Sequence, residues 1–193
     1  MVKMLDKLFS YVVLPVAVIL LVWGYLWGPS IYERSFAIPL DNQTPREQMV
    51  WKLAKQLKAK STLAVMPEIL ATTSNKGSLS VSEPFAPGII AVSTGILRDD
   101  SDFNESDVAA IIAHEIAHLE SSDSYKFWKK FSADWQRDIE AAADRRAAAL
   151  AGCVAVRSLF IRHYSKATQG WLNMSDPHPH PEDRIKAAGD CKP

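Results

Sequence analysis

The chain has 193 residues, of which 48% are hydrophobic and 23% are charged. Its 22 Lys and Arg residues balance its 22 Asp and Glu residues. It therefore lacks the basic excess that nucleic-acid binding needs, and we expect no nucleic-acid partner. Two cysteines are too few for a disulfide scaffold or a four-cysteine zinc site, and the composition excludes collagen-like and low-complexity chains.

A long apolar segment lies near the N-terminus. No charged residue occurs between Leu8 and Tyr32, and a helix over residues 8–27 would be roughly 30 Å long, the thickness of a bilayer core. A cleaved signal peptide has a shorter apolar region that ends near its cleavage site, whereas the first candidate site, Ser35-Phe36-Ala37, lies well beyond this segment. We therefore predict that residues 1–28 form an uncleaved transmembrane anchor that meets the membrane through residues 8–27.

The charges that flank this segment indicate its orientation. Lys3 and Lys7 precede it, and Glu33 and Arg34 follow it. The positive-inside rule then places the N-terminus in the cytoplasm. We expect a single-pass protein of a bacterial inner membrane with the rest of the chain in the periplasm. Cys153 and Cys191 could form a disulfide there, but the sequence leaves open whether they meet.

Past the anchor, residues 29–43 are predicted to be a linker and residues 44–193 a folded domain. Thr44-Pro45-Arg46-Glu47 has the pattern of a capped helix start, and we expect this helix to continue to about residue 59. Strands are predicted over 63–65, 68–72 and 88–93, with a hairpin turn over 75–78. Helical stretches are predicted over 105–121, 123–135, 136–151 and 154–167, followed by a short helix that begins near Glu182. The fold class is therefore α+β, with a small mixed sheet followed by a helical half.

The sequence His114-Glu115-Ile116-Ala117-His118 is an HExxH motif on a predicted helix. The i, i+4 spacing places both imidazoles on one helix face, where two nitrogens can bind one zinc ion. Glu115 beside them can accept a proton from water that the metal acidifies. We expect one zinc ion per chain.

A catalytic zinc needs a third protein ligand. Ser121 and Ser124 stand where metzincins carry Gly and a third His, and both cysteines lie downstream, whereas a deformylase-type Cys would lie upstream. Glu140 follows His118 by 22 residues, which is enough for a connection and a returning helix. Asp144, one turn further on, can accept a hydrogen bond from a ligand histidine.

These motifs resemble the gluzincin peptidases that include HtpX, the CAAX prenyl protease and the BepA-type proteases. The similar segments are the strand and turn from Gly88 to Leu97, the HExxH helix, the Glu140–Asp144 motif and the His178-to-Ile185 segment. The resemblance implies a zincin-like metallopeptidase domain with an HExxH helix bundle, and covers about residues 45–190. This chain departs from the family pattern at Glu83-Pro84-Phe85-Ala86-Pro87, where the family often has an Asn-Ala-Phe turn.

The resemblance also assigns roles to individual residues. Zinc ligands would be His114, His118 and Glu140, with Glu115 as general base and Asp144 behind the ligands. His178 would support the developing oxyanion or gate the metal, and Arg184 would order the loop that carries it. An extended protein substrate would add to the strand formed by Ile89, Ile90, Ala91, Val92 and Ser93, because an exposed strand edge offers unpaired amides and carbonyls.

The function expected from these roles is a membrane-anchored zinc endopeptidase that acts in quality control on unfolded or misassembled envelope proteins. The alternative is a low-turnover, membrane-tethered chaperone or binding module on the same fold. An aromatic stretch, Phe127, Trp128, Phe131 and Trp135, is either core packing or an interfacial helix. The oligomeric state, the substrate and the cleavage preference stay open.

Overall fold

A computed structural model describes residues 9–73, 79–83, 86–122, 133–164 and 180–189. The helices are η1 (Phe9–Val13), α2 (Leu14–Phe36), α3 (Pro45–Lys60), α4 (Thr94–Leu97), α5 (Glu105–Ser121), α6 (Ala133–Ala151), α7 (Cys153–Leu159), η4 (Phe160–Tyr164) and α8 (Pro181–Ala187). The strands are β1 (Ala37–Pro39), β2 (Glu68–Thr72), β3 (Leu79–Glu83) and β4 (Ala86–Ser93). This confirms the α+β class.

The four strands form one mixed sheet in the order β1-β2-β4-β3. β2 and β4 are parallel, with Glu68 opposite Ile89, whereas β1 and β3 each pair antiparallel with their neighbour. The small mixed sheet is thus confirmed. The predicted strand over 63–65 is wrong, because that segment is an irregular connection in which Val65 is exposed and has no strand to pair with.

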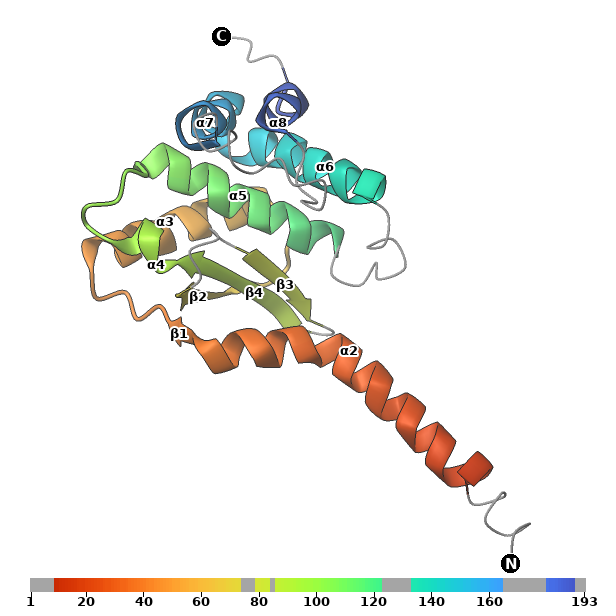
Figure 1. Cartoon of the computed structure of the whole chain (residues 1–193). Helices are drawn as coiled ribbons and strands as arrows, with labels where there is room; N and C mark the ends of the chain where they lie inside the picture. The colour runs from red at the N-terminus through yellow and green to blue at the C-terminus, as the bar shows by residue number, and fades with distance from the viewer. Residues whose placement is uncertain (1–8, 74–78, 84–85, 123–132, 165–179, 190–193) are drawn as a thin grey trace, which may run out of the picture.

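Helices cover both faces of the sheet (Figure 1). Ile69, Ala71, Ile90 and Val92 face the main core, which the sheet shares with α3, α5, α6 and α7. The alternate residues Leu70, Ile89 and Ala91 are buried in a separate cluster with Ala37, on the side where α2 contacts all four strands. Residues 69–72 of β2 and 88–93 of β4 are therefore withdrawn from water on both faces, as is typical of parallel strands.

The predicted linker over residues 29–43 is wrong in part. α2 continues through Phe36, and Ala37–Pro39 pairs with β2 as an edge strand. Pro29 and Pro39 suggested a linker, but Pro39 ends an edge strand, where a missing amide donor is tolerated. The apolar sheet face made by Leu70, Ile89 and Ala91 explains the longer helix, since that face needs an apolar cover.

Where it is described, the helical half follows the predictions; residues 123–132 and 165–167 of the predicted helices lie outside the described residues. Asn104 caps α5 and forms a capping box with Asp107, and α6 ends before Gly152, whose φ of 98° suits glycine. Two predicted boundaries change: Ala133–Trp135 belongs to α6, and residues 153–164 divide into α7 and the π-helix η4. The turn over 75–78 and the aromatic residues Phe127, Trp128 and Phe131 lie outside the described residues.

Candidate metal centre

Helix α5 presents the two histidines of the HExxH motif. Its other faces are anchored in the core by Val108, Ile112 and Ile116, none of which is exposed. The imidazoles of His114 and His118 lie one turn apart with their rings edge to face, and the two Nε2 atoms are 3.0 Å apart. The histidine side chains are only 15% and 17% exposed, so both nitrogens face a partly enclosed site.

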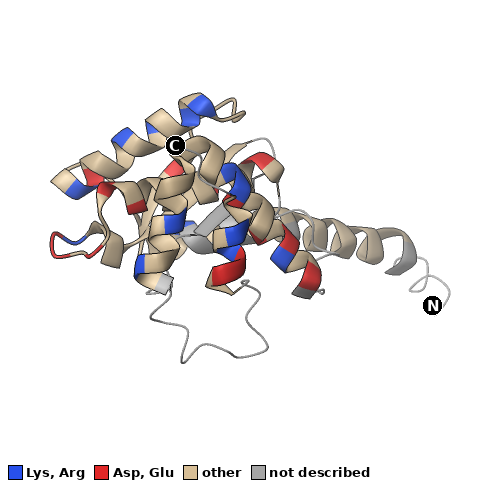
Figure 2. Ribbon diagram, turned by 90° about the horizontal axis from the view of Figure 1, so that it is seen from above, with Lys and Arg blue, Asp and Glu red and all other residues tan. Residues whose placement is uncertain are grey.

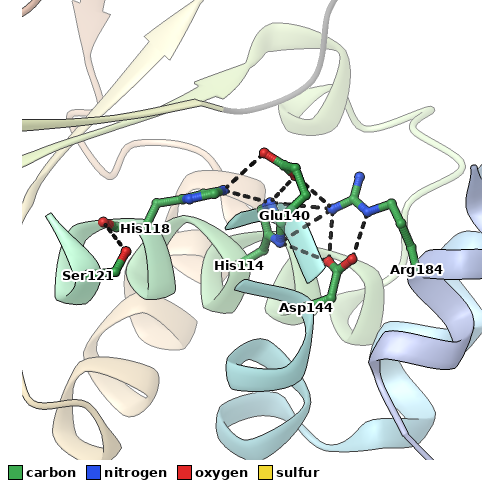
Figure 3. A network of polar contacts seen from close by, with 6 residues as sticks. All are labelled: His114, His118, Ser121, Glu140, Asp144 and Arg184. Atoms are coloured by element: carbon green, nitrogen blue, oxygen red, sulfur yellow. Dashed lines mark hydrogen bonds and ion pairs between the residues drawn. The ribbon is translucent and has the colours of Figure 1, made fainter. Parts of the chain in front are cut away.

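Helix α6 brings Glu140 to the same point (Figure 3). Small residues at the α5–α6 contact, Ala143 and Ala147, are buried and allow the helices to approach closely. The Oε2 atom of Glu140 lies 3.2 Å from Nε2 of His114, and Oε1 lies 3.5 Å from Nε2 of His118. The predicted ligand set, separated by 22 residues in sequence, is therefore assembled in space.

The distances within this triangle fit a tetrahedral zinc ion. Zinc bonds of about 2.0–2.2 Å place neighbouring ligand atoms about 3.3–3.6 Å apart. The contacts here are close to that range, at 3.0 Å between the two Nε2 atoms, 3.2 Å from His114 to Oε2 of Glu140 and 3.5 Å from His118 to Oε1 of Glu140. Oε2 of Glu140 is also buried without a hydrogen-bond partner, although His114 and Arg184 lie near it. The two oxygens of Glu140 each lie near one imidazole nitrogen, and a cation among them would satisfy the orphaned Oε2, so these residues fit zinc.

Asp144 fixes the orientation of His114. Its side chain is fully buried, and Oδ1 lies 3.0 Å from Nδ1 of His114. A carboxylate at Nδ1 holds the proton on that nitrogen and leaves the Nε2 lone pair directed at the metal position. The structure thus places Asp144 where the sequence predicted it, one helical turn after Glu140.

Arg184, on α8, holds Asp144 in turn. It donates from Nε and Nη2 to the two carboxylate oxygens of Asp144, at 2.8 Å each, and its Nη2 lies 3.4 Å from Oε2 of Glu140. Its guanidinium lies over the ring of Phe160, 4.4 Å from the ring centre. The site therefore combines residues from α5, α6 and α8, and η4 supplies the aromatic support.

The charges of the site shift three pKa values. Burial opposes the imidazolium of His114, but the adjacent carboxylates of Asp144 and Glu140 outweigh it and raise the pKa of His114. Burial likewise favours neutral carboxyl groups, yet His114 and His118 hold the pKa of Glu140 far below its usual range. His114 and Arg184 similarly lower the pKa of Asp144. Both carboxylates are thus ionised and stabilise positive charge at the centre of the site.

The remaining predicted site residues are placed differently. Glu115 is buried beside His114 on α5, with 5% of its surface exposed. His178 lies outside the described residues, and so does the loop that Arg184 was expected to order.

The prediction that substrate adds to Ile89, Ile90, Ala91, Val92 and Ser93 is wrong. β4 is a central strand, paired with β2 on one side and β3 on the other, so its edges are already used. The run Gly88–Val92 is apolar without alternation, which is the pattern of a strand buried on both faces. That signal was available in the sequence.

Two structural features had no clear sequence signal. Phe160 lies under Arg184, although 24 residues separate them in the chain. Glu120, just after the HExxH motif, accepts hydrogen bonds from Arg146 of α6 and from the amide of Thr62. This second contact ties α5, α6 and the α3–β2 connection together close to the ligands.

The fold and site define a metallopeptidase of the HExxH-plus-Glu type. Residues 43–133 match the model of Peptidase family M48, and the chain carries a domain of this zinc metallopeptidase family, whose members act on proteins. The match includes His114, Glu115 and His118, whereas Glu140, Asp144 and Arg184 lie beyond it and are brought to the site by the fold. No curated protein and no solved structure matches the chain significantly.

Proposed function

We propose that this protein is a membrane-anchored zinc endopeptidase that hydrolyses peptide bonds of unfolded or misassembled envelope proteins. The observation that carries the proposal is the cluster of His114, His118 and Glu140, whose ligand atoms all lie within 4.8 Å of one another, close enough to share one zinc ion. Three protein ligands leave one position open, as in catalytic rather than structural zinc sites.

The residues around the triangle have distinct tasks in this proposal. Zinc bound there supplies a Lewis acid that acidifies water and polarises the scissile carbonyl. Glu115 takes the proton from the attacking water and delivers it to the leaving amine. Asp144 keeps His114 in the required tautomer, and Arg184 keeps Asp144 in place. His178 remains the candidate for stabilising the oxyanion.

The substrate edge in this proposal is β3 instead of β4. Among the described strands, β3 has a neighbour only on its β4 side, and it contacts α5, the helix of both histidines. An extended polypeptide that pairs with the open side of Leu79–Glu83 would run beside the ligands and use main-chain hydrogen bonds. Such pairing needs an unfolded substrate, because a folded chain has its main-chain groups occupied.

Two observations support anchoring outside the cytoplasm. The segment Tyr11–Gly28 is long and apolar enough to cross a membrane, and none of it is buried in the domain core. Cys153 is disulfide-bonded, which suits an oxidising compartment such as the periplasm. Residues 1–28 would then be the anchor, with residues 44–193 as the peptidase domain.

The experiment that tests the proposal is cleavage of casein by the full-length, zinc-loaded protein in detergent. Glu115→Gln should bind one zinc ion and cleave nothing, whereas Glu105→Gln, an exposed position on the same helix, should behave like the wild type. His118→Ala should lose both zinc and cleavage. If the wild type binds zinc, prevents aggregation of an unfolded protein and cleaves nothing, the binding-module alternative replaces the peptidase.

A further inference from the structure

Helix α2 has two halves with different surroundings. From Tyr11 to Gly24 every described side chain is exposed, and the mean hydropathy is that of a membrane span. Leu26, Trp27 and Gly28 are partly buried, and from there α2 lies along the sheet, in contact with each of its strands. Figure 2 shows the projecting half free of charge, beside a domain in which acidic and basic residues are mixed. One continuous helix therefore joins the apolar segment to the domain.

The free half is too short to cross a bilayer alone. Residues 11–24 give a helix of about 21 Å, and a start at Leu8, directly after Lys7, gives about 25 Å. The hydrocarbon core is about 30 Å thick. In a bilayer of that thickness the missing length, about 5–9 Å, falls on the turn that contains Leu26, Trp27 and Gly28, because Lys7 ends the apolar run on the other side. Those residues are already partly buried, in the helix that contacts every strand of the sheet.

The part of the domain nearest to this turn is one end of the sheet. The end of β3 and the start of β4 lie beside α2 where it leaves the sheet (Figure 1), and α2 contacts both strands. The described residues at the start of β4, Ala86 and Pro87, carry no charge, and Pro87 is exposed. A membrane that holds α2 up to Gly28 would meet this end of the sheet.

We propose that the peptidase domain lies directly on the bilayer through the β3–β4 end of its sheet, and so acts on unfolded polypeptide segments close to that surface. The inference depends on the proposed membrane anchor and names the substrate class of the proposed peptidase. The partner is the phospholipid bilayer itself, reached by continuity with α2. The edge strand β3 then has its Glu83 end at the membrane surface and passes along α5, which carries the two histidine ligands.

The position of the domain is testable without catalysis. The full-length protein is placed in liposomes whose lipid headgroups chelate nickel, and a nitroxide is attached through a ketone-bearing residue at Pro87 or at Val154. Val154 is the control, since it is 70% exposed on α7 at the end of the domain opposite α2. Nickel should accelerate nitroxide relaxation at Pro87 and leave Val154 unaffected. Equal relaxation at both positions overturns the proposal.

A flexible insert gives the matched variant. About twelve Gly and Ser residues inserted after Gly24 add a mean span of about 19 Å and keep the half of α2 that covers the sheet. The nickel effect at Pro87 should disappear in this variant. Extraction of the liposomes with alkaline carbonate tests the anchor itself. If carbonate releases the full-length protein, the protein has no membrane anchor, and both the anchor and the inference are overturned. Failure to cleave casein overturns the peptidase alone, because the nitroxide reports position irrespective of turnover.

The substrate class is tested in the same liposomes. Single-span reporters carry one unfolded cleavable segment either next to the bilayer or after a spacer of about 40 residues. The wild type should cleave the near segment at least tenfold faster, the insert variant should cleave both at similar rates, and casein in solution should be cleaved equally by the two proteins. Equal rates of the wild type on near and far segments would refute the proposed restriction to the membrane surface.

Discussion

The half of α2 that lies on the sheet should be part of the folded domain, so its removal should destabilise the protein. We compare a chain that begins at Tyr25 with one that begins at Ala37. Within the described part of the chain, the first loses the side chains of residues 11–24, which are all exposed, whereas the second loses the helix that covers Leu70, Ile89 and Ala91. These three side chains are 2%, 0% and 0% exposed in the full chain.

The size of the effect follows from the area that the helix covers. Burial of a Leu or Ile side chain is worth about 1.5–3 kcal/mol, so exposure of Leu70 and Ile89 should cost about 3–6 kcal/mol. The ion pair between Arg34 and Glu68 adds at most about 1 kcal/mol, because both side chains are exposed. Since a domain of this size is stable by about 5–15 kcal/mol, the chain from Ala37 should be close to unfolding.

Urea unfolding followed by circular dichroism measures the difference. The chain from Tyr25 should unfold in one cooperative transition, and the chain from Ala37 should show a much lower midpoint or none. Equal midpoints for the two chains would show that α2 is not part of the domain. The result also bears on signal cleavage, because processing at Ser35-Phe36-Ala37 would remove the same cover.

Three further predictions concern the metal centre and its neighbour. Asp144→Asn should lower zinc affinity about 10–100-fold in competition with a chelator, whereas Asp138→Asn, exposed on the same helix, should not change it. Removal of zinc should lower the melting temperature, since zinc at 100 times its Kd adds about 2.7 kcal/mol of stability; an unchanged melting temperature would argue against a folded-state metal site. Glu120→Gln should cost about 1 kcal/mol in urea unfolding at neutral pH. Arg146 holds the pKa of Glu120 below 4.5, so this stabilisation is present above pH 4.5 and is lost as pH falls through the folded pKa. A difference that persists unchanged at pH 3 would contradict this account.

The parts of the site that the sequence could predict are those fixed by helical geometry. His114 and His118 share a face because of their spacing, and Asp144 follows Glu140 by one turn for the same reason. The pairing of Glu140 with the histidines needs α6 to pack back against α5. The sequence suggests this packing only through the 22-residue spacing from His118 to Glu140 and the run of alanines that follows Glu140. The position of Phe160 under Arg184 depends wholly on tertiary packing.

The two errors about strands have one cause. Strand propensity identified β4, but whether a strand is central or at an edge depends on partners elsewhere in the chain. β1 was missed because it has only three residues. β3 is as long as the predicted β2, and its alternating sequence from Leu79 to Ser82 could have been recognised. The error about the linker is similar. Pro29 and Pro39 locally favour an irregular connection, but the apolar sheet face at Leu70 and Ile89 is covered by a helix that continues into this segment.

The arrangement suggests how such a small enzyme would choose its substrates. Pairing along the open side of β3 would use main-chain groups, which every unfolded polypeptide carries, so the edge by itself selects for unfolded segments and not for a particular sequence. The contact between α2 and the sheet would add selection by place, because it fixes that edge relative to the bilayer. Selection for unfolded segments and selection by closeness to the bilayer together describe misassembled polypeptide at a membrane surface. Neither kind of selection requires a deep specificity pocket beside the metal ligands.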